Sequence, residues 1–264
     1  MTDCKLFDRE IAPGIYRISD ALHGPCADGY SDAPGAATQN SYLVLGEKRA
    51  ALIDLAIDTP ELYDYARRLT GKPVIILLTH GHPDHIYNIG KVSEVWLHPA
   101  DAFMITEGIP GISAPVGGVT IHPLSDGEET DLGGRKLTAI HIPGHTPGSL
   151  LFLDAQTRTL LAGDTCARRL LYGVTPSVPI KNYIQDLRKL SGYEFDVIYT
   201  AHDRCALPKQ YINTTIEALT RGGLKGSRQT IEIPGVDSMR FLRFGNEDSL
   251  SYFDCAVKDE YAEV

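Results

Sequence analysis

The stretch from Thr79 to His85 is rich in side chains that can bind a metal ion. Four of its seven residues qualify: His80, His82, Asp84 and His85. It directly follows the apolar run 74–78, which is too short for a helix and rich in branched side chains, as is typical of a buried strand. We therefore expect these ligands at the carboxyl end of a strand, on a rigid support.

Three more candidate ligands lie in turns that directly follow predicted strands. They are His145 in the turn 143–148, Asp164 in the turn 162–165 and His202 in the turn 200–203. With the first stretch they give five histidines and two aspartates. Imidazole nitrogen with carboxylate oxygen suits zinc, iron or manganese, whereas sites of oxygen alone suit magnesium and calcium. Seven ligands suffice for two ions if one carboxylate bridges them, and positions left open for water are typical of a catalytic site.

This pattern resembles the metallo-β-lactamase fold superfamily of metallo-hydrolases, over roughly residues 11 to 221. The HxHxDH stretch and the order of the three distant ligands carry the resemblance. It implies an α/β fold of four layers, an αββα sandwich, with two metal ions. By this resemblance the first ion is bound by His80, His82 and His145, the second by Asp84, His85 and His202, and both by the bridging Asp164.

Asp54 lies at the end of a predicted hairpin, 41–55. It matches an acidic residue of the same family, which implies that Asp54 accepts a hydrogen bond from a metal-bound histidine. We expect two divalent ions and favour zinc over iron or manganese. Such ions can lower the pKa of a bound water from ~15.7 toward ~7. We expect Asp84 to orient that water and then to pass a proton to the leaving group.

The expected reaction is hydrolysis of a small ester, thioester or lactone. True β-lactamases of the superfamily usually have Cys or Ser where this chain has Asp164, so the resemblance is to the glyoxalase II and lactonase branches. Glyoxalase II enzymes follow that Asp with a Gly-Cys-Gly-Arg element that this chain lacks, and lactonases often have Tyr at the position of Ala167. Three alternatives stay open: an iron-dependent sulfur oxidoreductase similar to persulfide dioxygenases, a β-lactam hydrolase, and a non-catalytic relative that binds a metabolite.

Four residues outside the ligand set are candidate substrate contacts: Arg168, Arg169, Tyr172 and Tyr30. Arginine makes bidentate contacts with carboxylate and phosphate groups, so the arginine pair predicts a small-molecule substrate of anionic character. Tyr30 belongs to the long loop 20–39, which we interpret as a flap over the site.

Composition argues against several classes of partner. The chain has 264 residues, 43% of them hydrophobic, and can therefore bury a large core. Its formal net charge of −9 opposes binding to nucleic acid. No apolar run approaches the ~20 residues of a membrane span, and the N-terminal residues carry charges where a signal peptide needs an apolar core, so we expect a cytoplasmic protein without a membrane partner. The five cysteines include no CxxC pair, which argues against a disulfide framework and a thiolate zinc finger.

The remaining patterns predict the elements that position these residues. Strands are expected at 13–18, in the hairpin 41–55 with its turn at 46–49, and at 74–78, 94–97, 119–121, 136–142, 149–153, 159–162 and 196–200. Helices are expected at 59–71, 86–91, 99–107, 180–190 and 209–221. We place a catalytic domain at 1–226 and a C-terminal hairpin extension, with strands at 239–244 and 249–253, at 227–264. This hairpin would cover a sheet edge or contribute to a homodimer.

Overall fold

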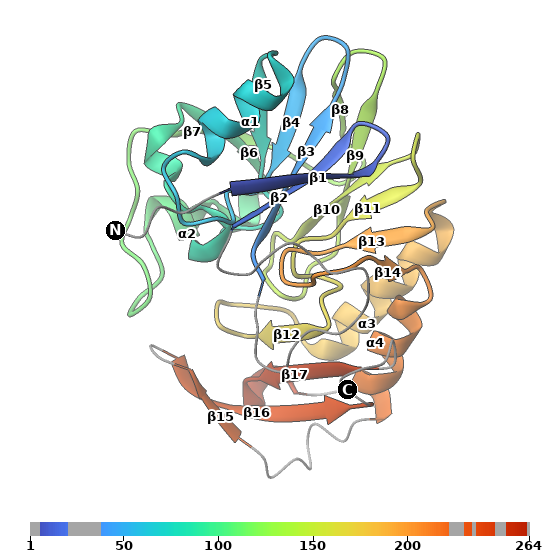
Figure 1. Ribbon diagram of the computed structural model, residues 1–264. Helices are drawn as coiled ribbons and strands as arrows, with labels where there is room; N and C mark the ends of the chain where they lie inside the picture. Colours follow the sequence, from blue (N-terminus) through green and yellow to red (C-terminus); the bar gives the residue numbers. More distant parts are fainter. Residues whose placement is uncertain (1–5, 21–37, 222–229, 234–235, 246–251, 263–264) are drawn as a thin grey trace.

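The computed structural model describes residues 6–20, 38–221, 230–233, 236–245 and 252–262 (Figure 1). Within them two large sheets pack face to face, and a smaller sheet that contains the C-terminal strands lies beside the second (Figure 1). In the described part of the chain, no helix is long and apolar enough to cross a membrane.

The first sheet has seven strands that follow the order of the chain. Strands β1 to β4 are antiparallel, and β4 to β7 are parallel. Their bounds are β1 Leu6–Ala12, β2 Ile15–Asp20, β3 Asn40–Leu45, β4 Ala50–Ile53, β5 Val74–Leu77, β6 Glu94–Leu97 and β7 Thr120–Pro123. Ile53 pairs with Leu77, so β4 and β5 end side by side. The residues that follow these two strands, Asp54 and the stretch from Thr79, are thereby brought together.

The second sheet has six strands in the order β14, β13, β11, β10, β9, β8. Strands β11 and β13 are parallel, and the other neighbours are antiparallel. Their bounds are β8 Glu129–Asp131, β9 Lys136–His141, β10 Leu150–Asp154, β11 Thr159–Leu161, β13 Val197–Tyr199 and β14 Leu207–Pro208. Because β10 is antiparallel to both of its neighbours, β9, β11 and β13 end at the same edge. Those ends precede His145, Asp164 and His202.

The third sheet combines a strand from the middle of the chain with the C-terminal strands, in the order β12, β17, β16, β15. Their bounds are β12 Arg169–Tyr172, β15 Thr230–Ile233, β16 Val236–Phe244 and β17 Phe253–Val257. Strand β12 is parallel to β17, and β17 is antiparallel to β16. The second strand of the expected hairpin is thus at Phe253–Val257, further along the chain than predicted, and residues 246–251 lie outside the described residues.

In the residues that the structure describes, four α-helices cover the outer faces of the two large sheets. Their bounds are α1 Leu62–Thr70, α2 Ala102–Thr106, α3 Ile180–Lys189 and α4 Tyr211–Arg221, with short 3-10 turns at Pro83–His85, Ile89–Lys91, Pro99–Asp101, Leu190–Gly192 and Asp259–Tyr261. The end of α1 matches its sequence signal, because Gly71 adopts a left-handed conformation and its N–H binds the Arg67 carbonyl. Its start is at Leu62, later than the predicted start at Thr59.

Three buried clusters fill the spaces between the layers. Between the two large sheets, Ile53 and Leu77 belong to the same cluster as Leu150 and Phe152. The outer face of the first sheet packs under α1 and α2, and the outer face of the second packs under α3, α4 and strands of the third sheet. This is the four-layer αββα arrangement that the family resemblance implies.

Strands β1, β8, β12, β14 and β15 were not predicted, and the first three lack a clear apolar pattern. β1 has the sequence LFDREIA with its central residues exposed, β8 has three residues, and β12 has four. The expected helix at 86–91 is reduced to the 3-10 turn Ile89–Lys91, and that at 99–107 is a 3-10 turn followed by the short α2. Strands this short or this exposed are held by their neighbours rather than by local propensity.

Candidate metal centre

All seven candidate ligands meet at one end of the two large sheets. His80 and His82 follow β5, Asp84 and His85 lie in the next 3-10 turn, His145 follows β9, Asp164 follows β11 and His202 follows β13. Three overlapping groups of three have ligand atoms within 4.8 Å of one another: His80, His82 and His145; His80, His85 and Asp164; and Asp84, His85 and His202.

The three-histidine half, consisting of His80, His82 and His145, is tightly gathered. The Nε2 of His145 lies 2.8 Å from Nδ1 of His82 and 3.1 Å from Nε2 of His80. All three side chains are buried. Three nitrogens converging in this way could together bind one metal ion.

The mixed half, consisting of Asp84, His85 and His202, is connected to the first through Asp164. Asp164 Oδ1 lies 3.2 Å from His85 Nε2 and 3.3 Å from His202 Nε2, whereas Oδ2 lies 3.4 Å from His145 Nε2. Asp84 Oδ2 lies 3.4 Å from His202 Nε2. One oxygen of Asp164 therefore faces each half, as a bridging carboxylate requires.

The histidine nitrogens that point away from the centre have hydrogen-bond partners. Nδ1 of His145 donates to the Leu171 carbonyl over 2.6 Å, and Nδ1 of His202 donates to the Thr38 carbonyl over 2.9 Å. A carbonyl accepts only, so these Nδ1 atoms carry the hydrogen, and Nε2 is the nitrogen left to bind a metal. His82 is reversed: Nδ1 faces the centre and Nε2 lies 3.3 Å from the Thr175 hydroxyl.

Asp54 holds the histidines of both halves. Its Oδ2 accepts from Nδ1 of His85 over 2.8 Å and from the Thr79 hydroxyl over 2.7 Å, and its Oδ1 accepts from the Thr79 N–H over 2.7 Å. The Thr79 oxygen in turn lies 3.0 Å from Nδ1 of His80. Because the hydroxyl hydrogen is directed at Asp54, Thr79 accepts from His80. Asp54 is buried and has a φ of 61°, in the left-handed region.

Burial controls the charge of the three-histidine half. It lowers the pKa of His80 well below the usual value, lowers that of His145, and lowers that of His82 to about 3. These imidazoles are neutral at pH 7, and the neutral ring is the form that binds a metal.

In the mixed half, neighbouring charges override burial. Asp164 and Asp54 raise the pKa of His85 to about 10, and Asp164 raises that of His202 well above its usual value. The same contacts lower the pKa of Asp164 and of Asp84 in spite of burial. The carboxylates are therefore ionised and are stabilised by positive charge beside them.

These residues fit metal ions. His85 Nε2 and Asp164 Oδ1 are buried without a hydrogen-bond partner, although both face the centre. Buried polar atoms are nearly always partnered, so an orphaned imidazole nitrogen and an orphaned carboxylate oxygen at one point fit a cation between them. Binding that cation would release the proton that His85 otherwise carries. Imidazole and carboxylate together suit zinc, iron or manganese.

The centre is most open on the side of Asp84. The side chain of Asp84 is 39% exposed, compared with 20% for His202 and 11% for Asp164. His80, His82, His85 and His145 are buried beneath them. A substrate would therefore approach from the mixed half.

Arg168, Arg169 and Tyr172, predicted as substrate contacts, have other neighbours in the structure. Arg168 is buried with its guanidinium carbon 5.2 Å from the centre of the Tyr252 ring, and the exposed Arg169 lies 3.8 Å from Asp254. Tyr172 is fully buried and its hydroxyl donates to the Val178 carbonyl. Its side chain is a core residue, because a fully buried ring has no surface to offer a substrate. Tyr30 and most of the loop 20–39, expected as a flap, lie outside the described residues.

Several residues that orient the ligands were not predicted. Thr79 and Thr175 contact ligand histidines through their hydroxyls, and Thr38 and Leu171 do so through backbone carbonyls. Thr79 directly precedes the ligand stretch, and this position is a signal that could have identified it. A backbone carbonyl has no sequence signal at all.

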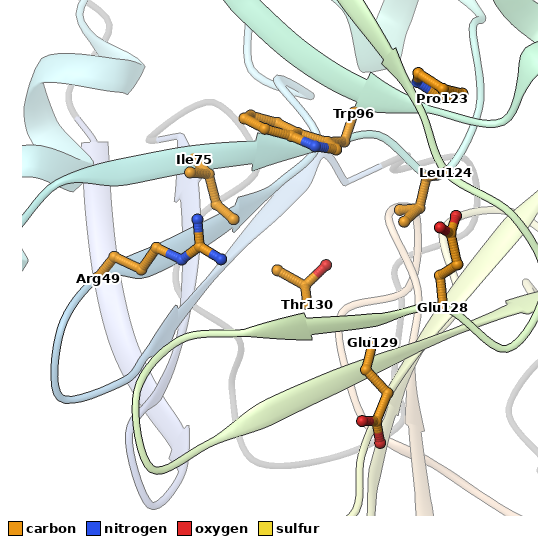
Figure 2. Close-up of a pocket in the computed structure, with 8 residues that line it drawn as sticks. All are labelled: Arg49, Ile75, Trp96, Pro123, Leu124, Glu128, Glu129 and Thr130. Atoms are coloured by element: carbon orange, nitrogen blue, oxygen red, sulfur yellow. The ribbon is translucent and has the colours of Figure 1, made fainter.

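A separate hollow of about 190 Å³ lies at the open edge between the two large sheets. Figure 2 shows Arg49, Ile75 and Trp96 on one side of it and Thr130 and Glu128 on the other. None of its lining residues is a candidate ligand. It is therefore distinct from the metal centre.

The chain belongs to the metallo-beta-lactamase superfamily, whose family model matches residues 34–202. An uncharacterised protein of Mycobacterium tuberculosis is 38% identical over 125 residues, which cover 39% of this chain and 55% of that protein. The chain thus spans about half the length of this relative. The acyl-coenzyme A thioesterase MBLAC2 of Gallus gallus is 26% identical over 184 residues, which cover 57% of this chain and 66% of that protein.

Solved structures show the same fold. A metallo-beta-lactamase from Pontibacter korlensis aligns with a TM-score of 0.64 at 17% identity, covering 82% of this chain and 99% of that one. A variant of a flavo di-iron protein from Thermotoga maritima aligns with a TM-score of 0.59 at 17% identity, covering 85% of this chain and 64% of that one.

Proposed function

We propose that this protein is a binuclear metal-dependent hydrolase that cleaves a small ester, thioester or lactone, with two zinc ions at the centre. The observation that carries the proposal is Asp164, whose two oxygens face different halves of the ligand set at 3.2–3.4 Å from His85 and His145. A carboxylate placed in this way suits a pair of ions rather than a single one.

The substrate class is supported by one relative. The name of the Gallus gallus relative describes an acyl-coenzyme A thioesterase, and it is 26% identical to this chain. Thioesters are therefore the first substrates to test, followed by esters and lactones. Cytoplasmic location and a homodimer remain predictions.

In the proposed mechanism, both halves of the ligand set would bind a metal ion and Asp84 would transfer a proton. The three-histidine half and the mixed half would each hold one ion, and these ions would polarise the carbonyl of the substrate and lower the pKa of a water. Asp84 is ionised and is the most exposed ligand candidate, so its carboxylate can orient the attacking water and accept a proton from it. The same carboxylate then passes that proton to the leaving group.

The test compares Asp84→Ala with Asp64→Ala, which removes an exposed carboxylate of helix α1 that lies outside the ligand set. Both variants and the wild type are loaded with zinc, analysed for metal content and assayed on a panel of thioesters, esters and lactones. We expect two zinc ions per chain and turnover of at least one substrate. Asp84→Ala should lower kcat by about 10²–10⁴-fold, the usual contribution of a general acid or base, and Asp64→Ala should not.

Two outcomes would contradict the proposal. Asp84→Ala with the metal content and the full activity of the wild type would remove Asp84 from the mechanism. Protein purified with iron that consumes oxygen in the presence of a persulfide, and hydrolyses nothing on the panel, would support the sulfur oxidoreductase instead.

A further inference from the structure

Asp101 is a buried carboxylate that the proposed mechanism does not use. It ends the 3-10 turn Pro99–Asp101 that follows strand β6, and its exposed fraction is 0%. Helix α2 starts at the next residue and buries Met104 and Ile105. The backbone of Asp101 is thereby fixed to the outer layer of the first sheet.

The carboxylate of Asp101 contacts both loops that carry the three-histidine half. Oδ1 accepts from the N–H of Gly148 over 2.6 Å, and Oδ2 accepts from the hydroxyl of Thr146 over 2.6 Å. Oδ2 also lies 3.3 Å from the N–H of Gly81. Gly81 is the residue between His80 and His82, and Thr146 follows His145. One side chain thus connects the loop after β5 with the loop after β9, across the two sheets.

The two glycines allow this close approach. A Cβ atom at Gly148 would lie 2.6 Å from the carboxyl carbon of Asp101, and one at Gly81 would lie 2.9 Å from the Asp101 carbonyl oxygen. Either distance is shorter than a real Cβ contact. The packing around Asp101 therefore leaves no room for a side chain at either position.

Thr146 is held from a second direction. Its hydroxyl donates to Asp101, so its oxygen accepts from the Ser149 hydroxyl at 2.8 Å, and its N–H donates to the Ser149 oxygen over 3.1 Å. Burial raises the pKa of Asp101 to about 6. At neutral pH the carboxylate is ionised and accepts the hydrogen bonds from Gly148, Thr146 and Gly81, which are stronger for a charged acceptor.

We propose that Asp101 is a positioning residue for the three-histidine half: it fixes the separation of the His80–His82 loop from the His145 loop and thereby sets the metal affinity of that half. The inference rests on the proposed metal centre, but not on any substrate. Asp54 acts on both halves through His85 and Thr79, whereas the contacts of Asp101 are confined to one.

The test is a titration of the metal-free full chain with Co²⁺, followed by visible absorption, which reports ligand geometry independently of activity. His82→Ala first identifies which binding step belongs to the three-histidine half. Asp101→Asn replaces one accepting oxygen with an NH2 group that cannot accept from an N–H or a hydroxyl. We expect it to weaken that step by about 10–100-fold, the usual effect of removing a residue that orients ligands, and to leave the other step within about threefold.

A matched control and a conservative pair complete the design. Asp154→Asn alters a carboxylate that is equally buried but paired with Arg135 at 2.8 Å, and its Co²⁺ titration should be that of the wild type. Thr146→Val should weaken the same step as Asp101→Asn, and Thr146→Ser, which keeps the hydroxyl, should restore it. The Thr146 pair gives the answer even if Asp101→Asn does not fold.

Several results would overturn the inference. One is a Co²⁺ titration of Asp101→Asn that equals that of the wild type. A second is an equal loss of Co²⁺ affinity at both binding steps. A third is equal Co²⁺ affinity of Thr146→Val and Thr146→Ser. The proposed function fails in a different way. A chain whose Co²⁺ binding depends on Asp101, but which hydrolyses no substrate, would refute the hydrolase proposal and leave this inference intact.

Discussion

The two ends of the sheet sandwich differ in the partners of their buried carboxylates. At the end away from the metal centre, Asp154 of β10 forms a bidentate pair with Arg135, with Nε–Oδ1 at 3.0 Å and Nη2–Oδ2 at 2.8 Å. The Thr157 N–H also donates to Asp154, and Arg135 donates to the Leu45 carbonyl. At the metal end, Asp164 Oδ1 is buried without a hydrogen-bond partner.

This difference separates stability from function. A buried charge must be compensated, and the chain itself supplies the compensating cation at the Arg135 end. At the metal end the neighbouring positive charges are histidines, which can release their protons, and the ligand atoms converge on a space that suits a cation from solution. The first end should therefore determine the free energy of unfolding, and the second should determine metal affinity.

The strongest test of this separation is Asp154→Asn. Removing one partner of a buried ion pair strands the other charge, so the free energy of unfolding at pH 7 should fall by about 3–5 kcal/mol. Against the effect of burial, Arg135 holds the pKa of Asp154 below its usual value. The stabilisation is therefore present above the unfolded pKa of about 3.9 and is lost as the pH falls through the lower folded pKa.

Urea unfolding of both proteins at pH 7 and at a series of lower pH values measures this effect. The difference between wild type and variant should be constant down to about pH 4 and should shrink below it. A difference that grows on acidification would contradict the assignment.

A smaller effect, confined to the metal end, is expected for Asp54→Asn. Asparagine tolerates the left-handed backbone, but its NH2 group donates and cannot accept. At the position of Oδ2 it would lose the hydrogen bonds from His85 and the Thr79 hydroxyl, and at the position of Oδ1 that from the Thr79 N–H. Because these contacts reach both halves, both Co²⁺ binding steps should weaken by about 10–100-fold. Calorimetric or absorption titration measures both steps, and weakening of one step alone would show that Asp54 does not serve both halves.

The smallest effect is expected for Thr175→Val, which removes the hydroxyl that lies 3.3 Å from His82 Nε2. Only one ligand loses a long hydrogen bond, so the step of the three-histidine half should weaken by about tenfold or less, at the lower limit for orienting residues. Thr175→Ser is the control that keeps the hydroxyl. Equal Co²⁺ affinities of the two variants would show that the Thr175 hydroxyl does not orient His82.

The convergence of the candidate ligands could be predicted because their side chains carry their own signal. Histidine and aspartate at short spacing, directly after apolar strands, identify both the residue types and the strand ends at which they lie. The apolar runs also predicted most residues of β5 and β10. Parallel order then brings distant strand ends to one edge.

The supporting contacts could not be predicted, because they depend on pairing between distant parts of the chain. Strand β12 is short and is defined by its pairing with β17, about eighty-five residues later, as in the register of Leu170 with Cys255. That pairing turns Arg168 and Tyr172, which looked like substrate contacts, into buried residues. Asp101 likewise gains its partners only when the two sheets pack together.

The left-handed backbone at Asp54 limits the substitutions that a lineage or a designer can try there. Glycine, asparagine and aspartate adopt this conformation most readily, and of the three only aspartate carries an anion. Glutamate would keep the charge but strain the backbone by about 1–2 kcal/mol. Transplanting this centre into another scaffold therefore requires the shape of the loop after β4 to be copied together with the ligands.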